Sequence, residues 1–247
     1  MLPIAIRNLH KLNRGNILSV LIIGLCGSGI PAFLFPFAET KISSSLAGLL
    51  NSLSPVFTLI IGIAFYGRKT FRSQIAGVFL GLVGAAGLLY SDSFTFNYYG
   101  LFVILATLLS GISSNEVSKL HGLTGLQLTA LAFFLISPLA LLYLPFSDFS
   151  NALHSEHWMR SLGFITILSV GGSAIALALY YMLIKDTNPV FGSMTTYFIP
   201  IVSTLWGFAA NEKFTVSMIF STIFIFAGVF IISRPAFIMK IKGKLSK

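Results

Sequence analysis

Two prolines lie deep inside long uncharged stretches of the sequence, and a polar residue precedes each of them by four positions. Asn51 precedes Pro55, and Thr196 precedes Pro200. A proline within a helix removes one N–H donor and displaces the carbonyl of residue i−4, which leaves backbone acceptors exposed. Interrupted helices of this kind line substrate sites near the middle of a membrane. We expect these four residues to form such a cavity; the alternative is a packing kink, with Asn and Thr bonding neighbouring helices.

Further polar and aromatic side chains in the same stretches are secondary candidates for lining the cavity. They are Ser28, Ser173, Tyr197, Tyr180, Ser110 and Trp206. A serine in a membrane helix often bonds its own backbone or an adjacent helix instead. Tyrosine and tryptophan near the end of a span are alternatively anchors at the membrane surface.

The residue types that catalysis or metal binding requires are missing from these stretches. Cys26 is the single cysteine, which excludes a disulfide framework and a cysteine metal cluster. No phosphate-binding loop is present, and His154 with His157 lacks a third ligand. Glu39 and Glu116 lie at span ends, so we expect them to be solvated and not to couple transport to protons. The sequence thus predicts no enzyme, no catalytic residue, no metal and no cofactor.

The elements that carry these residues follow from composition. Of the 247 residues, 55% are hydrophobic and 9% are charged, whereas soluble domains are about 25% charged. A hydrocarbon core of roughly 30 Å requires about 20 apolar residues in a helix. Continuous hydrophobicity without strict alternation favours helices over a barrel. We predict an all-α integral membrane protein whose eight spans are 16–37, 42–66, 73–91, 93–115, 120–147, 161–184, 187–211 and 214–233.

Positive charges are distributed unevenly between the connections. Alternate connections between the predicted spans lie on the same side of the membrane. By this assignment, thirteen of the sixteen Lys and Arg residues fall on one side. Cytoplasmic loops carry the excess of Lys and Arg, so we expect both termini in the cytoplasm and a multi-pass location in a plasma or bacterial inner membrane. This asymmetry also accounts for the net charge of +9. The expected partners are therefore the lipid bilayer and a small molecule, with no nucleic acid.

An offset of 145 residues aligns the two prolines and also aligns Gly27–Ser28 with Gly172–Ser173. Each aligned block contains three predicted helices, and an odd number gives the two copies opposite orientations in the membrane. Inverted repeats are typical of secondary transporters. The second copy is preceded by two additional helices. We divide the chain into a first repeat of three helices (1–91), a second repeat of five helices (92–234) and a basic cytoplasmic tail (235–247).

The pattern resembles the drug/metabolite transporter superfamily, in particular its EamA-type family. The resemblance is carried by NPVFGSMTTYFIPIVSTLWGFAANEKFTVSMIFSTIFIFAGVFIISRP, with Pro200 in the penultimate helix, Glu212 in a short turn, and Ala227–Gly228 late in the last helix. The first half repeats this pattern more weakly, with Gly67 or Arg68 where the family has Glu.

The usual plan of that family is ten helices in two inverted halves of five, and the resemblance implies that the first two of the ten are absent from the eight spans expected here. The resemblance implies a secondary transporter, an exporter of small metabolites or drugs that works by alternating access between the repeats. The alternative is a truncated, non-transporting or accessory membrane protein. A homodimer that completes the missing wall is a further possibility.

Overall fold

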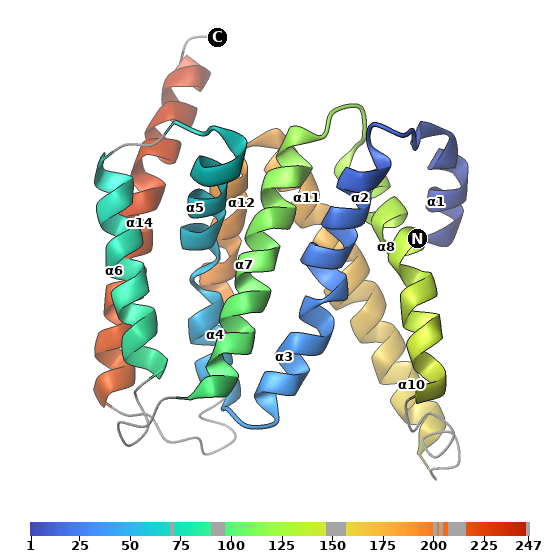
Figure 1. Ribbon diagram of the computed structural model, residues 1–247, viewed down its shortest axis with the longest axis horizontal. Helices are drawn as coiled ribbons and strands as arrows, with labels where there is room; N and C mark the ends of the chain where they lie inside the picture. Colours follow the sequence, from blue (N-terminus) through green and yellow to red (C-terminus); the bar gives the residue numbers. More distant parts are fainter. Residues whose placement is uncertain are drawn as a thin grey trace.

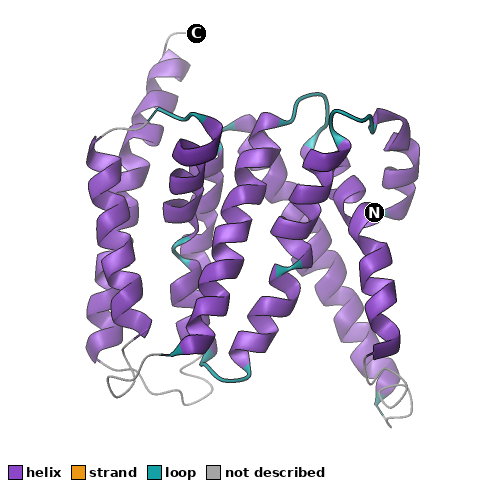
Figure 2. Ribbon diagram, in the orientation of Figure 1, coloured by secondary structure: helices purple, strands orange, loops and turns teal. Residues whose placement is uncertain are grey.

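The computed structural model describes residues 1–69, 72–89, 97–146, 157–199, 202, 205–206 and 216–245. Helices make up almost all of this part of the chain, and it contains no strand (Figure 2). Five helical stretches are long and apolar enough to cross a membrane: Ile17–Glu39, Ser44–Tyr66, Tyr98–Lys119, Gly125–Tyr143 and Trp158–Asp186. Gln74–Gly87 and Val216–Ile232 are shorter apolar helices. The predicted all-α membrane fold is confirmed.

Several of these spans consist of more than one helical segment. The first contains α2 (Ile17–Gly24), the π-helix η2 (Leu25–Gly29) and α3 (Pro31–Glu39), and the second contains α4 (Ser44–Asn51) and α5 (Ser54–Tyr66). Single helices follow as α6 (Arg72–Leu89), α7 (Tyr98–Lys119) and α8 (Gly125–Tyr143), with η3 (Leu144–Phe146) after α8. The next span contains α10 (Trp158–Ile167), the π-helix η4 (Leu168–Ile175) and α11 (Ala176–Asp186).

The predicted span 187–211 begins with α12 (Pro189–Ser193) and the 3-10 helix η5 (Met194–Tyr197), and most of its remainder lies outside the described residues. The last helix, α14 (Val216–Leu245), runs through most of the predicted basic tail. At the other terminus, α1 (Leu2–Asn8) and η1 (Leu9–Lys11) fold the start of the chain against α8, with Ala5 buried.

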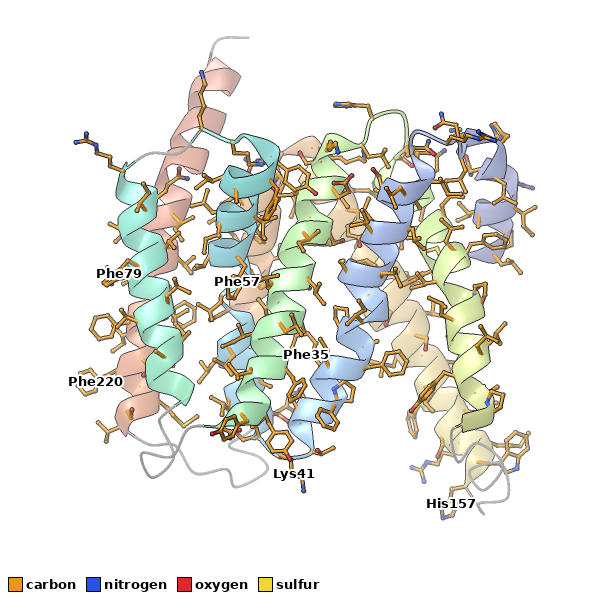
Figure 3. The ribbon with its side chains drawn as sticks, viewed as in Figure 1. Phe35, Lys41, Phe57, Phe79, His157 and Phe220 are labelled. Atoms are coloured by element: carbon orange, nitrogen blue, oxygen red, sulfur yellow. The ribbon has the colours of Figure 1, made fainter. Side chains whose placement is uncertain are left out.

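The spans stand side by side and run alternately up and down (Figure 1). One end of the bundle, upper in Figure 1, carries the start of α2, the ends of α5, α7 and α11, and the C-terminal end of α14. We call it the cationic end, because Arg14, Arg68, Lys119 and Lys185 lie in or beside these segments. Lys41 and His157 lie at the opposite end (Figure 3).

Apolar side chains divide between the interior and the outer surface of the bundle. Phe57 is buried within a core cluster that joins α3 to α7, α12 and α14. Phe79 of α6 and Phe220 of α14 point outward (Figure 3) and are exposed. An apolar outer surface is suited to lipid, because hydrocarbon and not water then contacts it.

The helices α6 and α14 form a tightly packed antiparallel pair. A Cβ atom added to Gly77 would lie 2.4 Å from the carbonyl oxygen of Gly228, and one added to Gly84 would lie 2.6 Å from that of Ser221. Such small residues allow two backbones to approach closely in a membrane.

The local structure follows the 145-residue offset. Ser43 caps α4 by accepting a hydrogen bond from the N–H of Leu46, and Asn188 caps α12 in the same way from Phe191. A π-helix interrupts the preceding span in both copies, in η2 around Gly27 and in η4 around its counterpart Gly172. The two aligned blocks therefore share these caps and π-helices, while the division of the chain into two repeats stays a prediction.

Candidate functional site

The first predicted helix break is present at the expected position. The helix α4 ends at Asn51, α5 begins at Ser54, and Pro55 lies in the first turn of α5. Proline suits that first turn, because the N–H it lacks has no partner within the helix there. The hydroxyl of Thr107 on α7 lies 3.3 Å from Asn51 Oδ1 and 2.8 Å from the carbonyl of Val103. The half-buried Asn51 therefore contacts α7, the first helix of the predicted second repeat.

The corresponding region of the second repeat is described only in part. Thr196 lies in η5, is half-buried, and donates a hydrogen bond of 2.7 Å to the carbonyl of Ser193. Pro200 and the side chain of Tyr197 lie outside the described residues. Among the described residues, no hydrogen bond joins Asn51 to Thr196. The cavity predicted at their level therefore stays a prediction.

A hydroxyl cluster joins α7 to α11 and brings Tyr180 near Ser110. The hydroxyl of Ser114 donates to the carbonyl of Ser110 at 2.8 Å, so the Tyr180 hydroxyl, 2.9 Å away, donates to Ser114. Ser110 Oγ itself donates to the carbonyl of Ala106 at 3.0 Å, as a serine in a membrane helix commonly does. Tyr180 thus bonds to a neighbouring helix and is only partly exposed, unlike the surface anchor considered as its alternative.

A second tyrosine connects the same helices to the first π-helix. Ser113 Oγ donates to the carbonyl of Ile23 at 3.2 Å, and the buried Tyr181 hydroxyl lies 3.1 Å from Ser113 Oγ. A Cβ on Gly27 would lie 2.4 Å from this tyrosine oxygen, so glycine is required for the close approach. Sequence reasoning missed Tyr181, although it directly follows the candidate Tyr180.

The remaining candidates lie in different surroundings. Ser28 is half-buried in η2, which packs against α7, whereas its counterpart Ser173 is exposed on η4. Trp206 is 70% exposed, a position that agrees with the alternative of an anchor at the membrane surface.

The expectation that Glu116 is solvated is wrong. This residue is 4% exposed, since α7 lies between α2 and α5 and both flank its last turn. Its Oε1 accepts a hydrogen bond of 2.5 Å from Ser19 Oγ on α2, and its Oε2 accepts one from the Tyr66 hydroxyl on α5. The run Ser113-Ser114-Asn115-Glu116 inside an apolar span is a sequence signal that could have identified it, because four consecutive polar residues place one on every face of the helix.

Polar groups next to Glu116 fix α5 and the residues that follow it against α7. Asn115 Nδ2 donates to the carbonyls of Thr58 and Gly111 at 2.8 and 2.9 Å. Beyond α5, Arg68 Nη2 donates to Ser118 Oγ at 3.2 Å. Burial lowers the pKa of the Arg68 guanidinium from its usual value, yet arginine stays charged in proteins.

Comparison with known proteins relates the whole chain to transporters. A family model described as the EamA-like transporter family matches residues 1–90 and 97–234. An uncharacterized transporter of Archaeoglobus fulgidus is 23% identical over 87% of this chain and 77% of its own length. Protein PecM of Dickeya dadantii is 20% identical over 85% of this chain and 72% of its own length. The uncharacterized inner membrane transporter YedA of Escherichia coli K12 is 24% identical over 77% of this chain and 62% of its own length.

A solved crystal structure shares the fold. It superposes with a TM-score of 0.61 at 19% sequence identity, and the match covers 95% of this chain and 83% of that one.

Proposed function

We propose a transport function from the premise that this chain belongs to the EamA-like transporter family. It is a multi-pass membrane protein of that family, and its proposed activity is secondary transport, the export of small metabolites or drugs. The two repeats move relative to one another, so that a site between them opens alternately to either side. In this proposal both termini are cytoplasmic, and the membrane is the plasma membrane or, as the printed name of YedA says for that relative, an inner membrane.

The observation that carries the proposal is the broken span formed by α4 and α5. The break places the half-buried Asn51 next to Thr107, and these residues come from different repeats. A polar contact at this junction can change when one repeat moves. The hydroxyls of Ser110 and Tyr180 and the half-buried Ser28 supply further polar groups along α7. Hydroxyl, amide and aromatic groups together suit amino acids, nucleobases and amphipathic drugs.

Flux measurements test the site. A resistance screen in cells that overexpress the chain identifies a transported compound, which is then followed in proteoliposomes. We expect Asn51→Leu combined with Thr196→Val to abolish flux while the protein remains inserted and stable, because both side chains bind substrate in the cavity. The matched control is Thr166→Val on α10, where an exposed threonine bonds only its own helix, at the carbonyl of Leu162. Unchanged flux in the double variant would reject the site.

The second candidate function is that of a non-transporting or accessory membrane protein. It is favoured by the span Trp158–Asp186, because only 6% of an apolar 18-residue stretch within this span is buried by the rest of the structure. A span with so little cover suits assembly with other helices, including those of a second copy. The two functions separate when the purified chain is reconstituted alone and its mass is measured by light scattering. Flux from a monomer rejects the accessory role, and a dimer with flux supports a transporter completed by its partner.

A further inference from the structure

The first segment of the chain carries exposed apolar side chains next to a cation. The helix α1 lies beside α8, close to the cationic end (Figure 1). Leu2 and Ile6 are four residues apart and therefore share one face of α1. Their side chains are 59% and 56% exposed, whereas Ala5 is buried. Arg7 in the last turn of α1 is also exposed, so the outer side of α1 is apolar and ends in a cation.

The residues between α1 and α2 add two cations at the cationic end of the bundle. Lys11 is half-buried in η1, and Arg14 is exposed in the turn that precedes α2. The N–H of Asn13 donates to Asn16 Oδ1 at 2.8 Å, and Asn16 Nδ2 donates to the carbonyl of Lys11 at 2.8 Å. These bonds give the two cations an ordered backbone. We call Arg7, Lys11 and Arg14 the basic corner.

Acidic side chains do not neutralise the basic corner. The segments η1 and the connection between α7 and α8 belong to one apolar cluster, and residues 1–38 and 117–147 contain neither Asp nor Glu. The described acids at the cationic end are Glu116, which is buried and pairs with Lys119 at 3.5 Å, and Asp186 at the end of α11. Among the described residues, no ion pair holds any of the three cations of the basic corner. Its positive charge is therefore available to an external anion.

We propose that the basic corner binds the headgroup of an anionic phospholipid, whose acyl chains lie against Leu2 and Ile6. Arginine and lysine donate charge-assisted hydrogen bonds to phosphate oxygens, and clustered cations beside a membrane attract anionic headgroups. A free phosphate would use the cations alone, whereas a lipid also covers the exposed apolar face of α1. Because a short turn joins η1 to α2, the bound lipid holds the start of this span at the membrane surface. The interaction does not depend on whether the chain transports a solute.

A local fluorescence measurement tests this proposal. A fluorophore is attached to the full chain at His10→Cys, an exposed position in η1, in a Cys26→Ser background, and the protein is placed in phosphatidylcholine nanodiscs. A small fraction of the lipid carries a nitroxide quencher high on its acyl chain and is either phosphatidylglycerol or phosphatidylcholine. The ratio of quenching by these two lipids measures the enrichment of anionic lipid at the corner. The matched control position is His157→Cys, an exposed histidine at the opposite end of the bundle (Figure 3).

We expect the ratio at position 10 to exceed that at position 157 by at least about fivefold, the factor that about 1 kcal/mol from a single basic residue gives. Equal ratios at the two positions would overturn the proposal. Arg7→Gln, Lys11→Gln and Arg14→Gln together lower the ratio at position 10 to the level at position 157. The control pair Lys41→Gln and Arg160→Gln, both exposed at the opposite end, leaves the ratio at position 10 unchanged. Enrichment that survives the triple substitution contradicts the assigned cations.

Two changes of solution decide the proposal even if the triple variant does not fold. Raising sodium chloride from about 0.1 M to about 1 M shortens the Debye length from about 10 Å to about 3 Å, so the enrichment at position 10 falls. Enrichment that salt leaves unchanged would reject an electrostatic contact with the headgroup. Inorganic phosphate that replaces chloride at equal ionic strength leaves the enrichment in place. If phosphate displaces the lipid where chloride does not, the corner is a site for free phosphate, and the lipid proposal is overturned.

Discussion

The predicted first and second repeats each contain a span interrupted by a π-helix, yet the two spans lie in different surroundings. The buried share of an apolar 18-residue stretch is 22% in the span Ile17–Glu39 and only 6% in the span Trp158–Asp186. The helices α7 and α8 pack against the first span, whereas much of α10 and η4 is exposed among the described residues.

The two aligned spans share their local helix structure, but the side chains that surround their π-helices differ. Gly27 and Gly172 are related by the 145-residue offset, and each lies within a π-helix. A Cβ on Gly27 would meet Tyr181 and Ser113, while a Cβ on Gly172 would meet only the side chain of Leu168 in its own helix. The first π-helix is therefore enclosed by neighbouring helices and the second is not, and this asymmetry can be tested residue by residue.

The largest expected difference is between Gly27→Val and Gly172→Val. The first substitution pushes atoms into the Tyr181 and Ser113 hydroxyls, and overpacking of this kind costs about 1–3 kcal/mol. The second adds a side chain at an exposed position and is expected to change stability by less than about 0.5 kcal/mol. Thermal unfolding of both variants in the same detergent measures the difference. Equal losses would mean that the second π-helix is as enclosed as the first.

A smaller difference is expected when a hydroxyl is removed from each region. Tyr181→Phe deletes the donor to Ser113 inside the first region and is expected to cost about 1 kcal/mol. Ser169→Ala on η4 removes only a bond to the carbonyl of Ile165 in the same helix, at an exposed site. Its effect should stay within a few tenths of a kcal/mol. Denaturation curves compare the two, and a Tyr181→Phe loss no larger than that of Ser169→Ala would remove the distinction.

The sequence predicted features that depend on local physics. Uncharged stretches indicated helices because lipid offers no partner to backbone polar groups, and Pro55 indicated the break that separates α4 from α5. Burial depends on neighbours and was harder to predict. Glu116 lies three residues from the end of its helix, which suggested solvent, but α2 and α5 extend alongside it. Ser28 and Ser173 each follow a glycine within a π-helix, but different surroundings leave the first half-buried and the second exposed.

The smallest expected change in stability is at the exposed π-helix η4, and a label at the same position shows what covers this helix. Single cysteines at positions 28 and 173 in a Cys26→Ser background can carry a spin label, and stability should change by less than about 0.5 kcal/mol for Ser173→Cys. If lipid covers η4, the label at 173 is relaxed strongly by dissolved oxygen, which concentrates in hydrocarbon, and the label at 28 is relaxed weakly. If both labels are relaxed weakly in the membrane, another helix pair or a second copy covers α10 and η4. The environments of the two repeats are then alike in the assembled protein, and the asymmetry belongs to the isolated chain alone.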